Sequence, residues 1–227
     1  MADSFWLSPA FLASAAFTAG LGCYSYVYLP IQMRRAYRQG LLTLARAVET
    51  KDTGSEGHGE RVAAYVVAVA KEMGVPAKER LKMEYAAFLE DIGNVRVPHA
   101  ILNKTSRLTK GEFDILKAHS VIGADMVEQV TFLRDIAPII RHHHEAWDGS
   151  GYPDKISGRD IPLGARIVAV CTAYDSMVHA RAYRARMTEE RAIQEVRAGA
   201  GTKYDPAVID VFLRVLRKRH ITEEPPS

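Results

Sequence analysis

The sequence of 227 residues contains few cysteines and has almost no net charge. Its two cysteines, Cys23 and Cys171, are far apart and lie in apolar stretches. This excludes a disulfide framework and is typical of a reducing compartment. The net charge of +3 is too small to indicate binding to a nucleic-acid polymer. With 48% hydrophobic and 25% charged residues, the composition is that of a globular protein with an ordinary core.

Charged residues are missing altogether from one segment near the N-terminus. None occurs between Asp3 and Arg34, and the twenty residues between Pro9 and Pro30 are rich in Ala, Leu, Phe, Gly and Tyr. A helix of that length measures about 30 Å, which matches the hydrocarbon core of a bilayer. We therefore predict a single-pass membrane anchor. A soluble hydrophobic helix docked on the rest of the protein is the alternative.

Basic residues follow the apolar segment at once, whereas the tail before it has none. Because Arg34, Arg35 and Arg38 stand directly after the segment, the positive-inside rule predicts an inner-membrane protein whose domain lies in the cytoplasm. The predicted organisation is an anchor, a linker helix, a domain and a disordered tail, at 1–33, 34–50, 51–220 and 221–227.

The alternation of polar and apolar residues that marks a half-buried β-strand is not sustained anywhere in the sequence. Apolar residues instead recur at helical spacing, as in the stripe over 62–73 that ends at Gly74. Thr109 and Glu112 form a capping-box signature, which predicts the start of another helix. The predicted fold class is all-α.

A run of three histidines continues one of these helical stripes. His143 and His144 follow Ile139 and Ile140 at a spacing of four residues, so both imidazoles are expected to face inward. His142 should point about 100° away from His143. Neutral imidazole is a common metal ligand. Two inward histidines that lead into a glycine-rich loop favour metal ligation over a hydrogen-bonded core pair.

The acidic pair Glu90–Asp91 breaks a local rule. Both residues fall in the last turn of a predicted helix, where the negative end of the helix dipole disfavours carboxylates. Apolar neighbours predict that at least one of them is drawn toward the core. A bound cation would offset the cost of this burial, and a solvated helix end is the alternative.

Several motifs occur in an order that resembles the HD-GYP family, a branch of the HD-superfamily metal-dependent phosphohydrolases. They are GHGERV at 57–62, LEDIGNVRVP at 89–98, ILNKTSRLTKGEF at 101–113, AHSVIGADM at 118–126, HHEAWDGSGYP at 143–153, IPLGARIVAV at 161–170, RAYR at 181–184 and GAGTKYDPAVI at 199–209. The resemblance implies a bundle of about seven helices, preceded here by one hydrophobic helix. It also implies iron or manganese ions and hydrolysis of cyclic di-GMP or a related cyclic dinucleotide.

The resemblance implies a role for each residue that matches a motif position. The implied metal ligands are His58, Glu90, Asp91, His119, His143 and His144. Asp91 would bridge two metals, and Asp175 would activate water or support a ligand, so both count as catalytic. The implied substrate-binding residues are Lys104, Tyr152, Pro153, Arg181 and Arg184.

The sequence departs from the family at three positions of this site. Glu90 replaces the histidine of the His–Asp doublet, Asn94 replaces a lysine, and Thr172 replaces an aspartate late in the domain. Glutamate reaches a metal differently from imidazole, and a threonine hydroxyl is a poor ligand. We therefore expect one well-formed metal site and one doubtful site, which contains His58.

Two functions are compatible with these departures. The first is a membrane-anchored HD-GYP protein of cyclic di-GMP signalling with weak or no turnover. It would bind a cyclic dinucleotide or a signalling partner such as a diguanylate cyclase. The second is an active phosphodiesterase with non-standard metal ligation. The first is favoured, because the loss of metal ligands costs more than the adjustment of binding residues. The sequence is also compatible with a homodimer.

Overall fold

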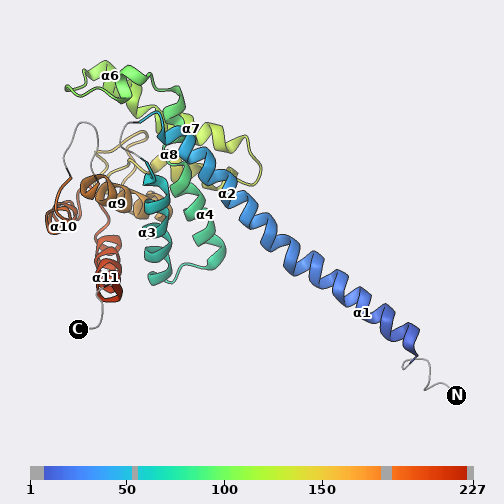
Figure 1. Ribbon diagram of the computed structural model, residues 1–227. Helices are drawn as coiled ribbons and strands as arrows, with labels where there is room; N and C mark the ends of the chain where they lie inside the picture. Colours follow the sequence, from blue (N-terminus) through green and yellow to red (C-terminus); the bar gives the residue numbers. More distant parts are fainter. Residues whose placement is uncertain (1–7, 53–55, 180–185, 224–227) are drawn as a thin grey trace. The chain divides into compact units, whose positions relative to one another are not determined.

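The computed structural model describes residues 8–52, 56–179 and 186–223, with the side chains described up to Lys218 (Figure 1). Contacts between Cα atoms divide the chain into two compact units, Met1–Gly40 and Leu41–Ser227. Each unit is described by itself below.

The apolar N-terminal segment is helical. Helix α1 (Pro9–Cys23) is capped by the Ser8 side chain, which accepts a hydrogen bond from the Phe11 amide at 3.2 Å. A π-helical turn, η1 (Tyr24–Tyr28), separates α1 from α2 (Leu29–Glu49). Pro30 explains this turn, because proline has no N–H to donate four residues back and its ring would clash with that carbonyl group.

The helical segment Pro9–Glu49 has 41 residues and is long and apolar enough to cross a membrane. Length and composition are the basis of that statement, and a core helix or a signal sequence passes the same test. The membrane anchor therefore stays a prediction.

The second unit contains α-helices and short 3-10 turns, and no β-strand occurs among the residues that the structure describes. The α-helices are α3 (His58–Glu72), α4 (Ala77–Leu89), α5 (His99–Leu102), α6 (Lys110–Lys117), α7 (His119–Glu128), α8 (Ala137–His142), α9 (Leu163–Val178), α10 (Glu189–Ala198) and α11 (Pro206–Glu223). The 3-10 turns are η2 (Ile92–Arg96), η3 (Arg134–Ile136) and η4 (Gly158–Asp160). Seven of these described α-helices have eight or more residues, which confirms the predicted all-α fold of about seven helices.

The core is centred on α3, α9 and α11, which contact one another. Val62 and Val66 of α3, Ile167 of α9 and Phe212 of α11 are fully buried. The rings of Tyr174 and Phe212 meet edge to face, with 5.2 Å between their centroids. Each such side chain contributes about 1.5–3 kcal/mol on burial. Helices α3 and α9 are therefore held firmly, and they carry functional side chains described below.

Candidate metal centre

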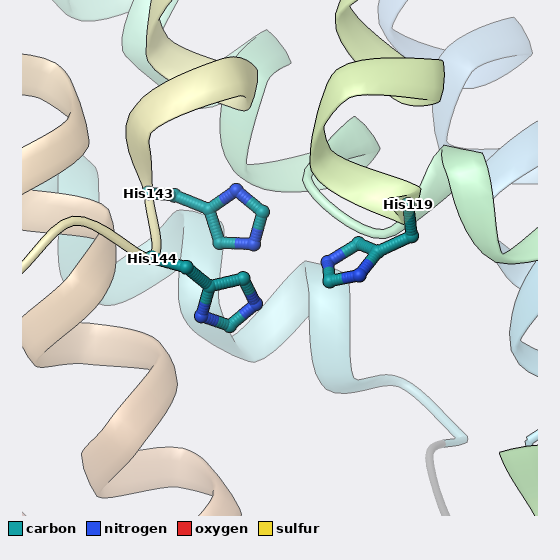
Figure 2. A group of neighbouring side chains, drawn as sticks. All are labelled: His119, His143 and His144. Carbon is teal, nitrogen blue, oxygen red and sulfur yellow. The ribbon is translucent and has the colours of Figure 1, made fainter. Parts of the chain in front are cut away.

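Histidines from α7 and from the segment after α8 form a cluster (Figure 2). His119 begins α7, while His143 and His144 follow the end of α8. One potential ligand atom of each residue lies within 4.8 Å of the other two. The ring centroids are 5.4 Å apart for His119 and His143, and 5.0 Å apart for His119 and His144. The three imidazoles converge on one point, which confirms the inward direction predicted for His143 and His144.

Backbone carbonyl groups fix the tautomer of two of these imidazoles. His119 Nδ1 lies 2.6 Å from the Leu116 carbonyl oxygen, and His143 Nδ1 lies 2.6 Å from that of Ile140. A carbonyl oxygen can only accept, so each Nδ1 carries the hydrogen and each Nε2 keeps its lone pair. His119 Nε2 is buried and has no hydrogen-bond partner among the described residues. An orphaned buried nitrogen of this kind fits a metal ligand.

Burial also keeps His143 and His144 uncharged. It lowers the pKa of His143, and it lowers the pKa of His144 well below its usual value, where repulsion from the other imidazoles adds to the effect. Both rings are therefore neutral near pH 7. A neutral imidazole has the lone pair that a metal needs.

Asp91 lies beside the histidine cluster. It precedes η2, and its Oδ1 atom is 3.5 Å from His119 Nε2. Gly93 makes this possible, because a Cβ atom there would overlap the carbonyl group of His119. The glycine thus lets η2 pack directly against α7. Three imidazole nitrogens and one carboxylate form a donor set that suits iron, manganese or zinc.

His58 lies in a second group of polar side chains, at the first turn of α3. Glu49 of α2 accepts hydrogen bonds from the amides of Gly57 and Gly59, at 2.8 and 2.7 Å, and so satisfies amides at the start of α3. His58 Nδ1 lies 2.7 Å from Asp175 Oδ2 of α9. Arg61 donates to both oxygens of Asp175, at 2.8 and 3.0 Å.

Glu90, which is only 2% exposed, faces this second group. Thr172 donates its hydroxyl hydrogen to the Glu90 carboxylate, whose oxygens lie 2.6 and 2.9 Å from Oγ1. His58 Nε2 is 3.4 Å from Glu90 Oε1, which is an ion-pair contact rather than a hydrogen bond. The burial expected for one member of the Glu90–Asp91 pair is confirmed.

The charge of His58 differs from that of the clustered histidines. Burial lowers the pKa of His58, but the carboxylates of Asp175 and Glu90 outweigh this effect and raise the pKa to about 10. With Asp175 and Glu90 as its partners, His58 is therefore an imidazolium near pH 7. Among the described residues, its group does not form a set of three ligand atoms within 4.8 Å of one another.

His142 points away from the three-histidine cluster, as the helical spacing predicted. Its ring faces the carboxylates of Glu145 and Asp154, at 3.7 and 3.6 Å. Asp154 also forms a bidentate pair with Arg141, at 2.7 and 2.8 Å, and its amide donates to Glu145. Because the Arg141 guanidinium already balances Asp154, this group ties the loop after α8 in place.

The signature loop at 148–153 returns to the cluster. The Tyr152 amide donates to the carbonyl oxygen of His144 at 3.2 Å, and the ring of Tyr152 stacks on that of His144 at 4.8 Å. Gly151 allows the close approach, because a Cβ atom there would overlap the backbone of Glu145 and Ala146. Burial raises the pKa of Tyr152, and the negative charge of Asp91 raises it further.

The other residues of the implied substrate site are less directly placed. Pro153 follows Tyr152 through a cis peptide bond. Lys104 holds both oxygens of Glu112 at 2.7 Å, within the capping box of α6 that the sequence predicted. Arg181 and Arg184 lie outside the described residues.

Two residues near the cluster were missed by the sequence reasoning. Phe113 of α6 meets the ring of Tyr152 edge to face, with 6.4 Å between the centroids. The Lys117 ammonium lies 5.1 Å from the ring centroid of Phe113. Their spacing of four residues on a helix was a signal that the two side chains share a face.

Comparison with known proteins identifies the family of this chain. A family model described as an HD domain matches residues 43–208. This chain belongs to the HD-domain family. Its ordered motifs, with the full DGSGYP loop, identify the HD-GYP branch.

The HD-domain chain is similar to curated cyclic-dinucleotide enzymes. It is 38% identical over 179 residues to the cyclic di-GMP phosphodiesterase response regulator RpfG of Xanthomonas campestris, covering 78% of this chain and 47% of that protein. It is 37% identical over 177 residues to a cyclic di-GMP phosphodiesterase of Thermotoga maritima, covering 77% and 48%. The chain thus spans about half the length of these relatives.

A solved structure shares the fold. The cyclic GMP-AMP specific phosphodiesterase V-cGAP3 of Vibrio cholerae superposes with a TM-score of 0.61 at 19% identity, covering 83% of this chain and 54% of that chain. This likeness establishes the helical HD fold.

Proposed function

We propose that this HD-domain chain binds a cyclic dinucleotide of the cyclic di-GMP type at a one-metal centre and hydrolyses it weakly or not at all. One observation carries the proposal. Three histidines converge with Asp91 in an arrangement that suits a metal. In the second group of polar side chains, Glu90 accepts a hydrogen bond from Thr172 and faces the charged His58. The names of the curated relatives supply the substrate class.

His119, His143, His144 and Asp91 would hold the ion, for which we propose iron or manganese. When bound, such an ion supplies hydroxide near neutral pH and neutralises charge on the phosphate. Other residues of the chain set the charge and orientation of His58 and Glu90. Arg61 and Asp175 hold the proton on His58 Nδ1, and Thr172 turns the Glu90 carboxylate inward. The phosphate then meets one cation fewer than in a two-metal site, which explains weak turnover.

An active phosphodiesterase is the second candidate, and the 3.4 Å contact between His58 and Glu90 favours it. His58 and Glu90 would then both hold a second ion, in place of the proton on His58 Nε2. The two candidates therefore differ in how many ions the chain binds.

Metal content and turnover separate the candidates. We expect the purified full chain to hold about one iron or manganese ion, to bind cyclic di-GMP, and to hydrolyse it barely. The Glu90→His, Thr172→Asp, Asn94→Lys triple variant should gain a second ion and turnover. Robust hydrolysis by the wild type that disappears in Asp91→Ala would establish the second candidate instead. If neither the wild type nor the triple variant binds metal, the proposed ligand set is wrong.

We also propose that residues 1–33 anchor the domain to the cytoplasmic side of the inner membrane. The long apolar helix and the arginines after it support this. Cell fractionation should place the full chain with the membranes and residues 40–227 in the soluble fraction. If both are soluble, the segment is a docked helix. A homodimer and a partner such as a diguanylate cyclase stay predictions.

A further inference from the structure

The aromatic contacts of the metal centre extend away from the three histidines. His144 stacks on Tyr152, with 4.8 Å between centroids and 27° between ring planes. Tyr152 in turn meets Phe113 edge to face, at 6.4 Å and 77°. A continuous row of rings therefore runs from the candidate metal site to α6.

The outer end of this row has an apolar ring in an exposed position. Phe113 is 46% exposed, so its ring is accessible to a ligand. The Lys117 ammonium lies 5.1 Å from the centroid of Phe113 and 5.9 Å from that of Tyr152, which is the range of cation–π contact. Asp114 holds the same ammonium at 2.6 Å and so limits where it can move.

We infer that Phe113 and Lys117 form a nucleobase platform that selects guanine, an inference that rests on the proposed cyclic-dinucleotide function. A phosphate at the histidine cluster places the attached base within reach of a neighbouring surface, and the row of rings leads from that cluster to Phe113. Nucleobases stack on aromatic side chains irrespective of sequence, because every base has a π-face. The stacking ring thus supplies affinity for either purine.

Lys117 supplies the choice between the purines. An ammonium group donates hydrogen bonds and accepts none. Guanine presents two acceptors, O6 and N7, on one edge, whereas adenine presents an N6 amino donor beside N7. The Lys117 ammonium, 5.1 Å from the centroid of Phe113, is therefore matched to guanine and opposed by the amino group of adenine. Cyclic di-GMP should bind more tightly than cyclic di-AMP.

Calorimetric titration of the full chain, purified in detergent with Mn²⁺, tests the platform with these two ligands. Phe113→Ala should weaken binding of both by about 5- to 150-fold, the range of one stacked base. Phe113→Tyr, which keeps a ring, should restore most of it. Phe132→Ala is the matched control, because Phe132 is similarly exposed at 49%. Lys117→Met should reduce the preference for cyclic di-GMP by about fivefold or more, through weaker cyclic di-GMP binding, and should not weaken cyclic di-AMP binding.

The outcomes distinguish the platform from the function on which it rests. Manganese content, measured in every variant, should stay at the wild-type level, because neither residue belongs to the ligand set. If the wild type binds neither cyclic dinucleotide, the proposed function and the platform both fail. If the wild type binds but Phe113→Ala behaves like Phe132→Ala, the platform alone is wrong. A guanine preference that survives in Lys117→Met would overturn the role of that lysine.

Discussion

The two halves of the candidate site use the same kinds of side chain, but their histidines differ in charge. On one side, burial keeps His143 and His144 neutral, and their neighbour Asp91 is partly open, with 35% of its side chain exposed. On the other side, His58 is charged and Glu90 is almost fully buried. The first half offers nitrogen lone pairs to a cation. In the second half, the carboxylates already have partners, namely the protonated His58 and the hydroxyl group of Thr172.

This difference shows how one substitution can change the chemistry of a buried site. An imidazole at position 90 would need a cation or an acceptor opposite it, but a glutamate brings its own negative charge. Thr172 and the imidazolium of His58 supply partners for that charge from within the protein. A buried polar group without partners is costly, so internal partners lower the need for a metal.

Removal of a ligand from the intact half should have the largest effect. His144→Ala should weaken metal binding by at least about 100-fold, because a direct ligand contributes more than the outer partners for which 10- to 100-fold is typical. Elemental analysis of the dialysed protein should then find almost no metal. The wild type should also gain thermal stability on addition of Mn²⁺, by about 2.7 kcal/mol at 100 times Kd, and His144→Ala should not.

The neighbouring histidine provides the control for this variant. His142→Ala removes an imidazole from the same turn, but one that faces Glu145 and Asp154 instead of the cluster. It should keep the metal content of the wild type. If both variants lose metal equally, the histidines affect metal binding by maintaining the local fold. The contrast between the two halves would then not be supported.

A smaller effect is expected from the hydroxyl group in the altered half. Thr172→Val removes the donor to Glu90 while keeping the shape of the side chain, so a buried carboxylate loses its hydrogen bond. Unfolding by urea should show a loss of about 1–3 kcal/mol. Metal content should not change, because Thr172 is not a ligand of the intact half.

Thr202→Val is a suitable comparison for this variant. Its hydroxyl group donates to the Gly199 carbonyl, which also accepts backbone hydrogen bonds, so little should be lost. If Thr172→Val costs no more stability than Thr202→Val, Glu90 does not depend on its hydroxyl partner. If it instead lowers the metal content, Thr172 belongs to the metal centre and the two halves are not independent.

Local periodicity in the sequence predicted the direction of several site residues, but few of the contacts between residues that are far apart in the sequence. The directions of His142, His143 and His144 followed from 3.6 residues per turn, and the capping box of α6 from residues three apart. The bond between Glu90 and Thr172 joins residues 82 positions apart, which no local pattern reveals. The same holds for Phe113 and Tyr152, which meet only because the signature loop folds back over the cluster.

The smallest effect is expected at Lys104, which the family resemblance places in the substrate site and the structure places beside Glu112. The Lys104 ammonium and the Thr109 amide hold the pKa of Glu112 at about 2, below its ordinary value of 4.5. A lowered pKa in the folded state stabilises the fold above pH 4.5, and this contribution is lost as the pH falls through about 2. In Lys104→Met the pKa should return toward 4.5, so acid unfolding should begin at a higher pH.

Circular dichroism along an acid titration measures this shift, and Lys110→Met, on the helix that carries Glu112, serves as the control. Lys104→Met also decides between two roles for Lys104, because each role predicts a different result. If Lys104 is a partner of the capping residue Glu112, the variant shifts the pH of acid unfolding and leaves cyclic di-GMP affinity unchanged. A phosphate ligand lowers that affinity with the acid transition unchanged, and the substrate site would then reach across α6 to the loop at 101–109. Since both oxygens of Glu112 already lie 2.7 Å from the Lys104 ammonium, we expect the first result.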